Sequence, residues 1–502
     1  MTHRSVLLIL DGMGLSETDQ GSAVTRKTMP TFFALAERQG CARLEASGPG
    51  VGLESGKAGN SEVGHVNIGA GRMVPGTLSR IDDAWASGEW AEAGPWESLA
   101  GEARLHLVAL LSDAGVHGHW RTAARAAQLA ARHGVAEVFV HVVLDGVDSR
   151  AGSAPGLLDA LVEEVAAIPR ARIATVSGRK WACDRSGDLD LTRYCVAGLR
   201  GEIEQPVFSR DALAQHLERE GVESAFPFHV VDRDGFIARG EPVLLCSHRA
   251  DRASQLAAVL DVRSVVYAMV PMEGGIIPRE RVFFPTRPVK EGLVDSLREH
   301  GIRALRIAEE CKFPHVTWFI NGLRELPADT PAECIPSVPE SGIAVRPEMS
   351  IEALCESVLG ALRDSRNQAL IVNIANLDQV GHTGRLDLAV RAAGAVDRAL
   401  GRILEACRQH DWSAVITADH GNADCMLTPD GEPLGSHSAN PVPLVVESRH
   451  GGMPLHGVTG PLALVAPVFL ATLGLPAPRS MVPLPEGVAP APAARAGLAE
   501  TS

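Results

Sequence analysis

The chain of 502 residues has no paired cysteine motif, no excess of positive charge and no long apolar run. Its nine cysteines stand singly, at positions such as Cys41, Cys183 and Cys425. An odd number without any C-x-x-C pair argues against a disulfide framework or a cysteine metal site, and favours a reducing compartment. Lysine and arginine number 47 against 61 aspartates and glutamates, for a net charge of −14. This balance disfavours a broad nucleic-acid-binding face, although a few arginines suffice for a small anion pocket.

Apolar stretches are too short for a membrane span or a secretion signal. The N-terminal stretch, "VLLIL", is five residues long, whereas a bilayer span needs roughly 18 or more apolar residues. Hydrophobic residues still make up 45% of the chain and charged residues 22%, which is ordinary globular composition. We therefore expect a soluble cytoplasmic protein of two or three domains, a monomer with no nucleic-acid or membrane partner.

Short apolar runs that end at polar residues alternate with alanine- and leucine-rich segments. Runs of this kind are residues 5–10, 138–144, 172–176, 243–246, 369–374 and 413–417. They are typical of buried strands in a parallel sheet. The segments between them, such as 121–134 and 386–410, have apolar positions at helical spacing. The alternation predicts an α/β fold, in which ligands bind at the carboxyl ends of the strands.

Two proline- or glycine-containing joints suggest how the chain divides. They lie near residues 73–79 and 278–292. We expect one discontinuous domain of residues 1–75 and 286–483, with residues 76–285 inserted as a second domain. Residues 484–502 are rich in proline and alanine and are expected to form a mobile tail.

Metal-type ligands gather in three segments of the C-terminal part. The segment "NIANLDQVGHTG" carries Asp378 and His382, "TADHGNADC" carries Asp419 and His420, and "GSHSANPVP" carries His437. Asp11, at the end of the first apolar run, is a fourth candidate position. Carboxylates and neutral imidazoles bind divalent ions such as Mn²⁺ and Zn²⁺. Any one segment could equally be a structural Asp–His pair, and the residues alone leave both interpretations open.

A glycine-rich segment, "GNSEVGHVNIGAGR" from Gly59 to Arg72, adds a serine to this set. Together with "LILDGMG", "NIANLDQVGHTG", "TADHGN" and "HSANPVP" it resembles the motifs of the cofactor-independent phosphoglycerate mutase family of the alkaline phosphatase superfamily. The resemblance runs from about Ser5 to about Leu475. It implies an α/β fold with an alkaline-phosphatase-like metal-binding domain and an inserted second α/β domain that binds substrate.

The resemblance also implies two divalent metal ions, usually manganese, and a nucleophilic serine. One ion is then held by Asp378, His382 and His437. The other is held by Asp11, Asp419, His420 and the oxygen of Ser61, which would take the phosphoryl group. A bound divalent ion makes a weakly nucleophilic hydroxyl reactive near neutral pH. Structural hydrogen bonding is the expected role of Glu62 and His65 in the same motif.

Substrate contacts follow from the same resemblance. It assigns the phosphoryl group to Arg249, Arg252 and Lys312, since arginine offers a planar fork of donors. It assigns the glycerate part to His117, Asp148, Arg179 and Arg185, with Asp148 as a general acid and base between two hydroxyls. Without the resemblance, Arg249 and Arg252 read as a solvated basic turn. His117 then reads as a helix cap and Asp148 as a turn residue.

Departures from the family pattern fall on the substrate side. The family's "DGRD" is here "DGVD", so Val147 stands in place of an arginine, and "RPDR" is here "RADR". The metal and serine motifs match the family, and the resemblance therefore implies a glycolytic isomerase that interconverts 3-phosphoglycerate and 2-phosphoglycerate through a phosphoserine. The loss of one arginine keeps an alternative function open. In this alternative, the protein is a mutase-like transferase of phosphonate metabolism, which moves a phosphonoformyl or related group to a phosphoglycerate.

Overall fold

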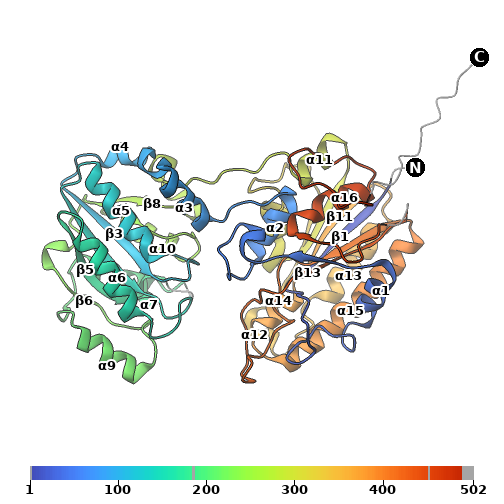
Figure 1. Cartoon of the computed structure of the whole chain (residues 1–502), viewed down its shortest axis with the longest axis horizontal. Helices are drawn as coiled ribbons and strands as arrows, with labels where there is room; N and C mark the ends of the chain where they lie inside the picture. Colours follow the sequence, from blue (N-terminus) through green and yellow to red (C-terminus); the bar gives the residue numbers. More distant parts are fainter. Residues whose placement is uncertain (1–2, 184–186, 450–452, 489–502) are drawn as a thin grey trace, which may run out of the picture. The chain divides into compact units, whose positions relative to one another are not determined.

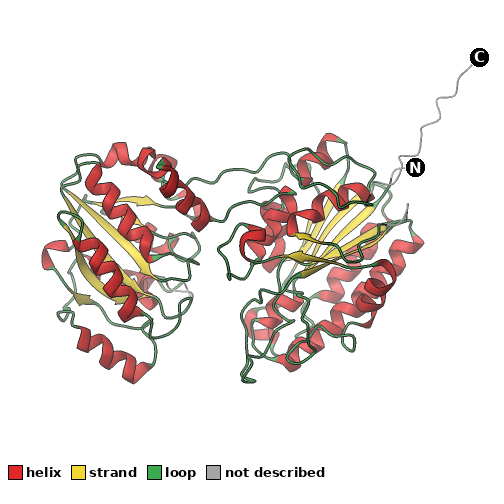
Figure 2. Ribbon diagram, viewed as in Figure 1, coloured by secondary structure: helices red, strands yellow, loops and turns green. Residues whose placement is uncertain are grey.

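The computed structural model describes residues 3–183, 187–449 and 453–488, which fold into two compact units (Figures 1 and 2). The first unit contains the two ends of the chain, up to Gly76 and from Arg287 onward, and the second contains Thr77–Thr286. Each unit has its own sheet, its own helices and its own apolar core. Of the predicted tail, residues 489–502 lie outside the described residues, and Val488 is buried.

The first unit is built on an eight-stranded sheet in the order β10-β9-β11-β1-β12-β13-β2-β14. The strands are β1 (Ser5–Leu10), β2 (Ala42–Glu45), β9 (Ala304–Glu309), β10 (Ala332–Ile335), β11 (Ala369–Ile374), β12 (Ser413–Thr417), β13 (Val442–Glu447) and β14 (Thr459–Pro461). Strands β10, β9, β11, β1 and β12 are parallel to one another, and β13 is antiparallel to β12.

Strand β1 lies inside this sheet, with β11 on one side and β12 on the other. Ser5 pairs with Ala369 of β11 and with Ser413 of β12, and all six residues of β1 are buried. A strand covered on both faces needs no polar alternation, which explains its continuous apolar run. The parallel pairing brings the carboxyl ends of β1, β9, β11 and β12 to one edge of the sheet.

Helices surround the sheet of the first unit (Figure 2). They are α1 (Pro30–Gln39), α2 (Ser61–Ala70), α11 (Leu293–Glu299), α12 (Glu340–Ile343), α13 (Ile351–Arg363), α14 (Asn376–Gly381), α15 (Leu386–Gln409) and α16 (Val465–Thr472). The longest, α15, buries an apolar stripe against α13 and α1, as its helical spacing predicted. Helix α2 begins at Ser61 and ends at Ala70, and its C-cap is Gly71, whose positive φ of 63° suits glycine.

The second unit has a six-stranded sheet in the order β6-β5-β4-β3-β7-β8. The strands are β3 (Arg104–Leu111), β4 (Glu137–Leu144), β5 (Ala171–Gly178), β6 (His229–Val230), β7 (Pro242–Leu245) and β8 (Val265–Ala268). All pairs are parallel except that of β5 with the short edge strand β6. Loops that follow β3, β4, β5 and β7 therefore share one edge of this sheet.

Helices of the second unit include the alanine-rich segment predicted from its spacing. They are α3 (Thr77–Ser87), α4 (Pro95–Leu99), α5 (Trp120–Arg132), α6 (Ala154–Ala166), α7 (Arg179–Ala182), α8 (Leu189–Leu199), α9 (Arg210–Glu220) and α10 (Ser254–Asp261). The cap of α5 is His119, whose side chain accepts a hydrogen bond from the backbone N–H of Arg121.

The fold class predicted from the sequence, α/β with a second α/β domain, is confirmed. None of the helices in the described ranges combines the length and the apolar character that a bilayer crossing requires.

Candidate functional site

Charged and polar side chains collect where the parallel strands of the first unit end. Asp11 follows β1, Asp378 lies on α14 after β11, and Asp419 and His420 follow β12. Lys312 ends the short turn η6 (Glu310–Lys312) that follows β9. These positions come from four separate parts of the sequence, and the sheet brings them to one edge.

Ser61 reaches this edge as the first residue of α2. The side chain of Asn60 caps the helix, because its Oδ1 accepts a hydrogen bond from the N–H of Val63 at 3.0 Å. Ser61 Oγ lies 2.9 Å from His420 Nε2 and 3.2 Å from Asp11 Oδ1. A Cβ at Gly64 would lie 2.6 Å from the carbonyl oxygen of Asp419, so glycine allows α2 to pack against the segment that carries Asp419 and His420.

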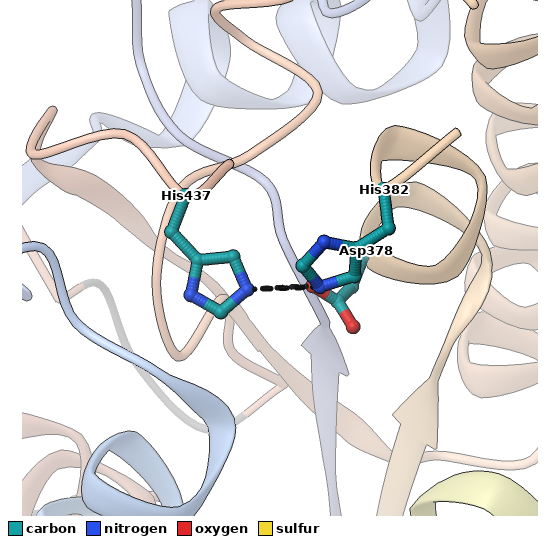
Figure 3. Close-up of side chains that lie close together, drawn as sticks. All are labelled: Asp378, His382 and His437. Carbon is teal, nitrogen blue, oxygen red and sulfur yellow. Dashed lines mark hydrogen bonds and ion pairs between the residues drawn. The ribbon is translucent and has the colours of Figure 1, made fainter. Parts of the chain in front are cut away.

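One group of metal-type ligands consists of Asp378, His382 and His437 (Figure 3). The Nε2 atoms of both histidines lie 3.2 Å from Asp378 Oδ1 and 3.1 Å from each other. Each histidine donates its Nδ1–H to a backbone carbonyl, His382 to Gly435 at 2.9 Å and His437 to Gly59 at 2.7 Å. In the neutral rings, these hydrogen bonds leave the Nε2 lone pairs available for a metal ion on the Asp378 side.

The neighbouring group contains Asp11, Asp419 and His420, all fully buried. His420 Nε2 lies 3.5 Å from Asp11 Oδ1 and 3.5 Å from Asp419 Oδ2. Asp419 Oδ1 accepts hydrogen bonds from the backbone N–H of Gly12 and of His420 itself. The buried Oδ2 accepts no hydrogen bond among the described residues and has only ion-pair contacts, to His65 Nδ1 at 3.2 Å and to His420 Nε2 at 3.5 Å. A buried carboxylate oxygen of this kind fits a cation ligand.

Lys312 lies between the two groups. Its Nζ is 2.7 Å from Asp11 Oδ1, 2.7 Å from Asp378 Oδ2 and 2.6 Å from Ser61 Oγ. Burial by itself lowers the pKa of Lys312, but the carboxylates of Asp11, Asp378 and Asp419 outweigh it and raise the pKa above its ordinary value. Lys312 is therefore a fixed positive charge beside the serine hydroxyl.

The pKa values of Asp11 and Asp378 are shifted in opposite directions. Burial and the negative charge of Asp419 raise the pKa of Asp11. Burial alone would also raise the pKa of Asp378, but Lys312, His382 and His437 bring it well below the ordinary value. The hydrogen bond to Asp378 in turn raises the pKa of His382. Two adjacent buried carboxylates whose pKa values are shifted in opposite directions are typical of a functional site.

Two residues in contact with these carboxylates were not predicted as site residues. Asn373, on β11, donates one hydrogen bond to Asp11 Oδ2 at 2.7 Å and lies 3.1 Å from His65 Nε2. His65 Nδ1 lies 2.8 Å from the carbonyl oxygen of Ser61 and 3.2 Å from Asp419 Oδ2. The structural hydrogen bonding expected of His65 thus goes to the carbonyl of Ser61 and to the side chain of Asn373, beside the carboxylates. Asn373 was overlooked because it interrupts an otherwise apolar run, and that interruption was the available signal.

The second unit brings together a separate set of predicted residues at the carboxyl ends of its strands. Arg179 NH1 lies 2.5 Å from Asp145 Oδ1 and 2.7 Å from Asp148 Oδ2. Asp145 is fully buried and also accepts hydrogen bonds from the backbone N–H groups of residues 147, 148 and 149. It orients the turn that carries Asp148, and its place directly after an apolar run was the signal for it. His117 Nε2 lies 3.9 Å from Asp148 Oδ2.

Asp251 lies at the centre of the remaining predicted residues. Its Oδ1 is 3.5 Å from His117 Nδ1 and 3.5 Å from Arg249 Nε, and its Oδ2 is 3.5 Å from Arg252 Nε. Burial raises the pKa of Asp251, but His117 and Arg249 bring it down to about 2. Sequence reasoning missed Asp251, although it lies inside the "RADR" turn. Arg185, the remaining predicted residue, lies outside the described residues.

Known proteins match the chain over nearly its whole length. The family described as the metalloenzyme superfamily matches residues 3–477. Two 2,3-bisphosphoglycerate-independent phosphoglycerate mutases, from Moorella thermoacetica and Trichodesmium erythraeum, are 35% and 34% identical to the chain. Each alignment covers 95% of this chain. It covers 96% of the length of the Moorella protein and 94% of the length of the Trichodesmium protein.

A solved structure gives the same result. The phosphoglycerate mutase of Leishmania mexicana, in a crystal structure at low cobalt concentration, superposes with a TM-score of 0.77 and 26% identity. The alignment covers 96% of this chain and 97% of the Leishmania chain. The resemblance inferred from the motifs is confirmed, and the chain belongs to the 2,3-bisphosphoglycerate-independent phosphoglycerate mutases of the metalloenzyme superfamily.

Proposed function

We propose that this protein interconverts 3-phosphoglycerate and 2-phosphoglycerate by passing the phosphoryl group through Ser61. The observation that carries the proposal is the position of Ser61 Oγ, within 3.2 Å of Lys312 Nζ, His420 Nε2 and Asp11 Oδ1. Membership of the mutase family supplies the substrate class. The comparisons do not favour the phosphonate transferase that the substrate-side departures left open.

Divalent metal ions are the cofactors that the family and the Asp–His groups support. We propose two ions, with Mn²⁺ as the first choice. Asp378, His382 and His437 would hold one, and Asp11, Asp419, His420 and Ser61 Oγ would hold the other. The nitrogen and oxygen donors, together with an Asp419 Oδ2 that accepts no hydrogen bond among the described residues, fit such ions. When bound, they favour loss of the serine proton and neutralise phosphoryl charge.

The residues of the chain divide the transfer between them. Ser61 Oγ forms a bond to phosphorus while the bond from phosphorus to the glycerate 3-oxygen breaks, and the reverse step delivers the phosphoryl group to the 2-oxygen. Lys312 holds positive charge beside Oγ, and Arg249 and Arg252 would add donors for the phosphoryl oxygens.

The Asp148 carboxylate would take the proton of the 2-hydroxyl and pass it to the 3-oxygen, which regenerates the carboxylate and balances the protons over the cycle. Arg179 keeps the Asp148 carboxylate oriented, and His117 lies beside it. Arg179 and the predicted Arg185 would bind the glycerate carboxylate.

An enolase-coupled assay on manganese-loaded protein tests the proposal. We expect conversion of 3-phosphoglycerate, loss of activity on chelation, and recovery with Mn²⁺ compared side by side with Zn²⁺, Mg²⁺ and Co²⁺. Ser61→Ala should abolish turnover, whereas Ser61→Cys keeps a nucleophile of similar size as the matched variant. A parent protein without mutase activity, or a Ser61→Ala variant with full activity, would overturn the proposal.

A further inference from the structure

A buried carboxylate beside the candidate metal groups has so far been given no role. Asp424 is 1% exposed and follows His420 by four residues. Its Oδ1 accepts a hydrogen bond from the backbone N–H of Gly14 at 3.1 Å. Its Oδ2 accepts hydrogen bonds from Ser438 Oγ at 2.8 Å and from Asn440 Nδ2 at 2.7 Å. One side chain thus joins its own segment to that of Gly14, 410 positions away, and to that of Ser438 and Asn440.

Each joined segment carries a predicted metal ligand. Gly14 lies three residues after Asp11, and Ser438 directly follows His437. A Cβ at Gly14 would overlap the Asp424 carboxylate, so this approach requires glycine. Backbone hydrogen bonds from Asn422 N–H to Gly12 O and from Ser438 N–H to Gly421 O support the same arrangement, at 2.9 and 3.0 Å.

Among the described residues, no basic side chain balances the charge of Asp424. Within residues 3–183, 187–449 and 453–488, no lysine, arginine or histidine forms an ion pair with it. Burial of a carboxylate without a basic partner costs several kcal/mol of stability. The donors here, however, are Gly14 N–H, Ser438 Oγ–H and Asn440 Nδ2–H, and they approach both oxygens of the side chain. A carboxylate offers two acceptor oxygens, whereas an amide offers one.

We infer that Asp424 is a positioning residue that holds His437 in place to act as a metal ligand. This inference rests on the proposed function, because His437 matters as a ligand only if that group holds a metal. Among the described residues, Asp424 belongs to neither group of candidate metal ligands. It acts through Ser438, the residue next to His437, and Asn440 fixes the following turn.

A swap of donor and acceptor tests the inference. In Asp424→Asn the introduced amide can still accept from Gly14, but its NH₂ group faces the NH₂ group of Asn440. Addition of Asn440→Asp restores the hydrogen bond with its direction reversed, because the introduced NH₂ group at position 424 can donate to the introduced carboxylate at position 440. The two side chains of the double variant have the same number of heavy atoms as those of the parent. The readouts are metal stoichiometry by mass spectrometry and dissociation constants by isothermal titration with Mn²⁺, without reliance on activity.

The parent is expected to bind two ions. Asp424→Asn should weaken one of them by about 10- to 100-fold, the range for residues that orient metal ligands. The double variant should return to within a few-fold of the parent. In a His437→Ala background Asp424→Asn should cause no further loss, because the ligand that it positions is gone.

Asp397 provides the matched control. It is another buried aspartate, 4% exposed, whose carboxylate accepts hydrogen bonds from the backbone N–H groups of Thr31 and Phe32 at 3.0 Å each. Asp397→Asn should lower the thermal midpoint without a change in metal affinity. If Asp424→Asn does not fold, Ser438→Ala removes the hydrogen bond that Asp424 accepts from the residue next to His437, and should weaken the same ion.

Three results would overturn the inference: parent-like affinity for both ions in Asp424→Asn, equal weakening of both ions, or no recovery in the double variant. A parent that binds no divalent ion contradicts the proposed function instead, so the two failures can be told apart.

Discussion

Lys312 Nζ lies 2.6 Å from Ser61 Oγ, although the two residues are 251 positions apart in the sequence. The same Nζ contacts Asp11 and Asp378, one carboxylate from each group of candidate metal ligands. The ammonium group therefore links the nucleophile to both groups. A lysine in this place stabilises negative charge that develops on the serine oxygen and on a phosphoryl group bound next to it.

Replacement of Lys312 should impair turnover more than binding. We expect Lys312→Met to lower kcat by about 10² to 10³, the range for loss of one transition-state donor, with a smaller change in KM. Lys312→Arg keeps the charge but not the compact shape, and should recover part of the rate. Steady-state kinetics in the enolase-coupled assay measure both constants. A kcat within twofold of the parent for Lys312→Met would contradict this role.

In metal-free protein, Lys312→Met should lower the free energy of unfolding. In chelated protein, Lys312→Met leaves the buried Asp11 and Asp378 without their ammonium partner, which costs about 3 kcal/mol or more of unfolding free energy. Added Mn²⁺ should narrow the difference, since a divalent ion would supply the missing charge. Chemical denaturation with and without Mn²⁺ measures the difference in unfolding free energy between the parent and Lys312→Met. Lys27→Met, at an exposed position, serves as the control. A difference unaffected by metal would contradict the expectation.

Val147 is the clearest departure on the substrate side, and its effect can be measured. The side chain is 64% exposed in the turn that Asp145 organises. Val147→Arg adds a charged donor for the glycerate carboxylate, and we expect KM for 3-phosphoglycerate to fall by about three- to tenfold, the effect of one partly exposed charged hydrogen bond. Val147→Leu is the matched uncharged control. An equal change in both variants would show that size, not charge, is responsible.

Glu309 should make the first unit less stable as pH rises. It is the fully buried last residue of β9, and burial raises its pKa from 4.5 to about 7 despite a hydrogen bond from Ser350 N–H. Between these values the folded state binds more protons than the unfolded state, so unfolding free energy falls with increasing pH. Glu309→Gln should therefore stabilise the protein by up to about 3 kcal/mol at pH 8 and have little effect near pH 4.5. Denaturant unfolding at both pH values tests this, and equal effects would contradict it.

The second unit should respond to acid in the opposite direction. Burial is the main cause that lowers the pKa of His119 and of His248 to about 4, and burial also lowers the pKa of His106 and His141. Between pH 6.5 and 4 the folded unit binds fewer protons than the unfolded chain. Its stability is thus complete above pH 6.5 and is lost as pH falls through this window.

Hydrogen exchange separates the two units in this experiment. After correction for intrinsic rates, we expect β3 and β4 to lose protection between pH 7 and pH 5 more than β1 and β11. His248→Gln retains a partner for Thr122 Oγ1, which lies 2.9 Å from His248 Nε2, and should reduce the acid sensitivity. Equal loss of protection in both units would contradict the assignment.

Much of the fold and part of the site could be predicted from the sequence. Asp11, Asp419 and His420 follow apolar runs directly, and parallel strands place such residues at one edge of a sheet whatever the details of packing. The motifs in turn identified the family. The metal and substrate roles of individual residues, the identity of the ions and the cytoplasmic location stay predictions.

Contacts between distant segments were decided only by the tertiary structure. Asn373 looks like an irregular residue in a strand, and Asp424 and Asp251 look like ordinary residues of polar turns. Their roles depend on which atoms lie within about 3 Å across the fold, and strand register and helix packing set those distances. The sequence by itself determined which ligand types follow which strands. Only the folded chain determined that Lys312 contacts Ser61 and that Asp424 joins the segments of Asp11, His420 and His437. A hydrogen bond requires two atoms to lie within about 3 Å of each other, and the positions of residues in the sequence do not fix distances between atoms that closely.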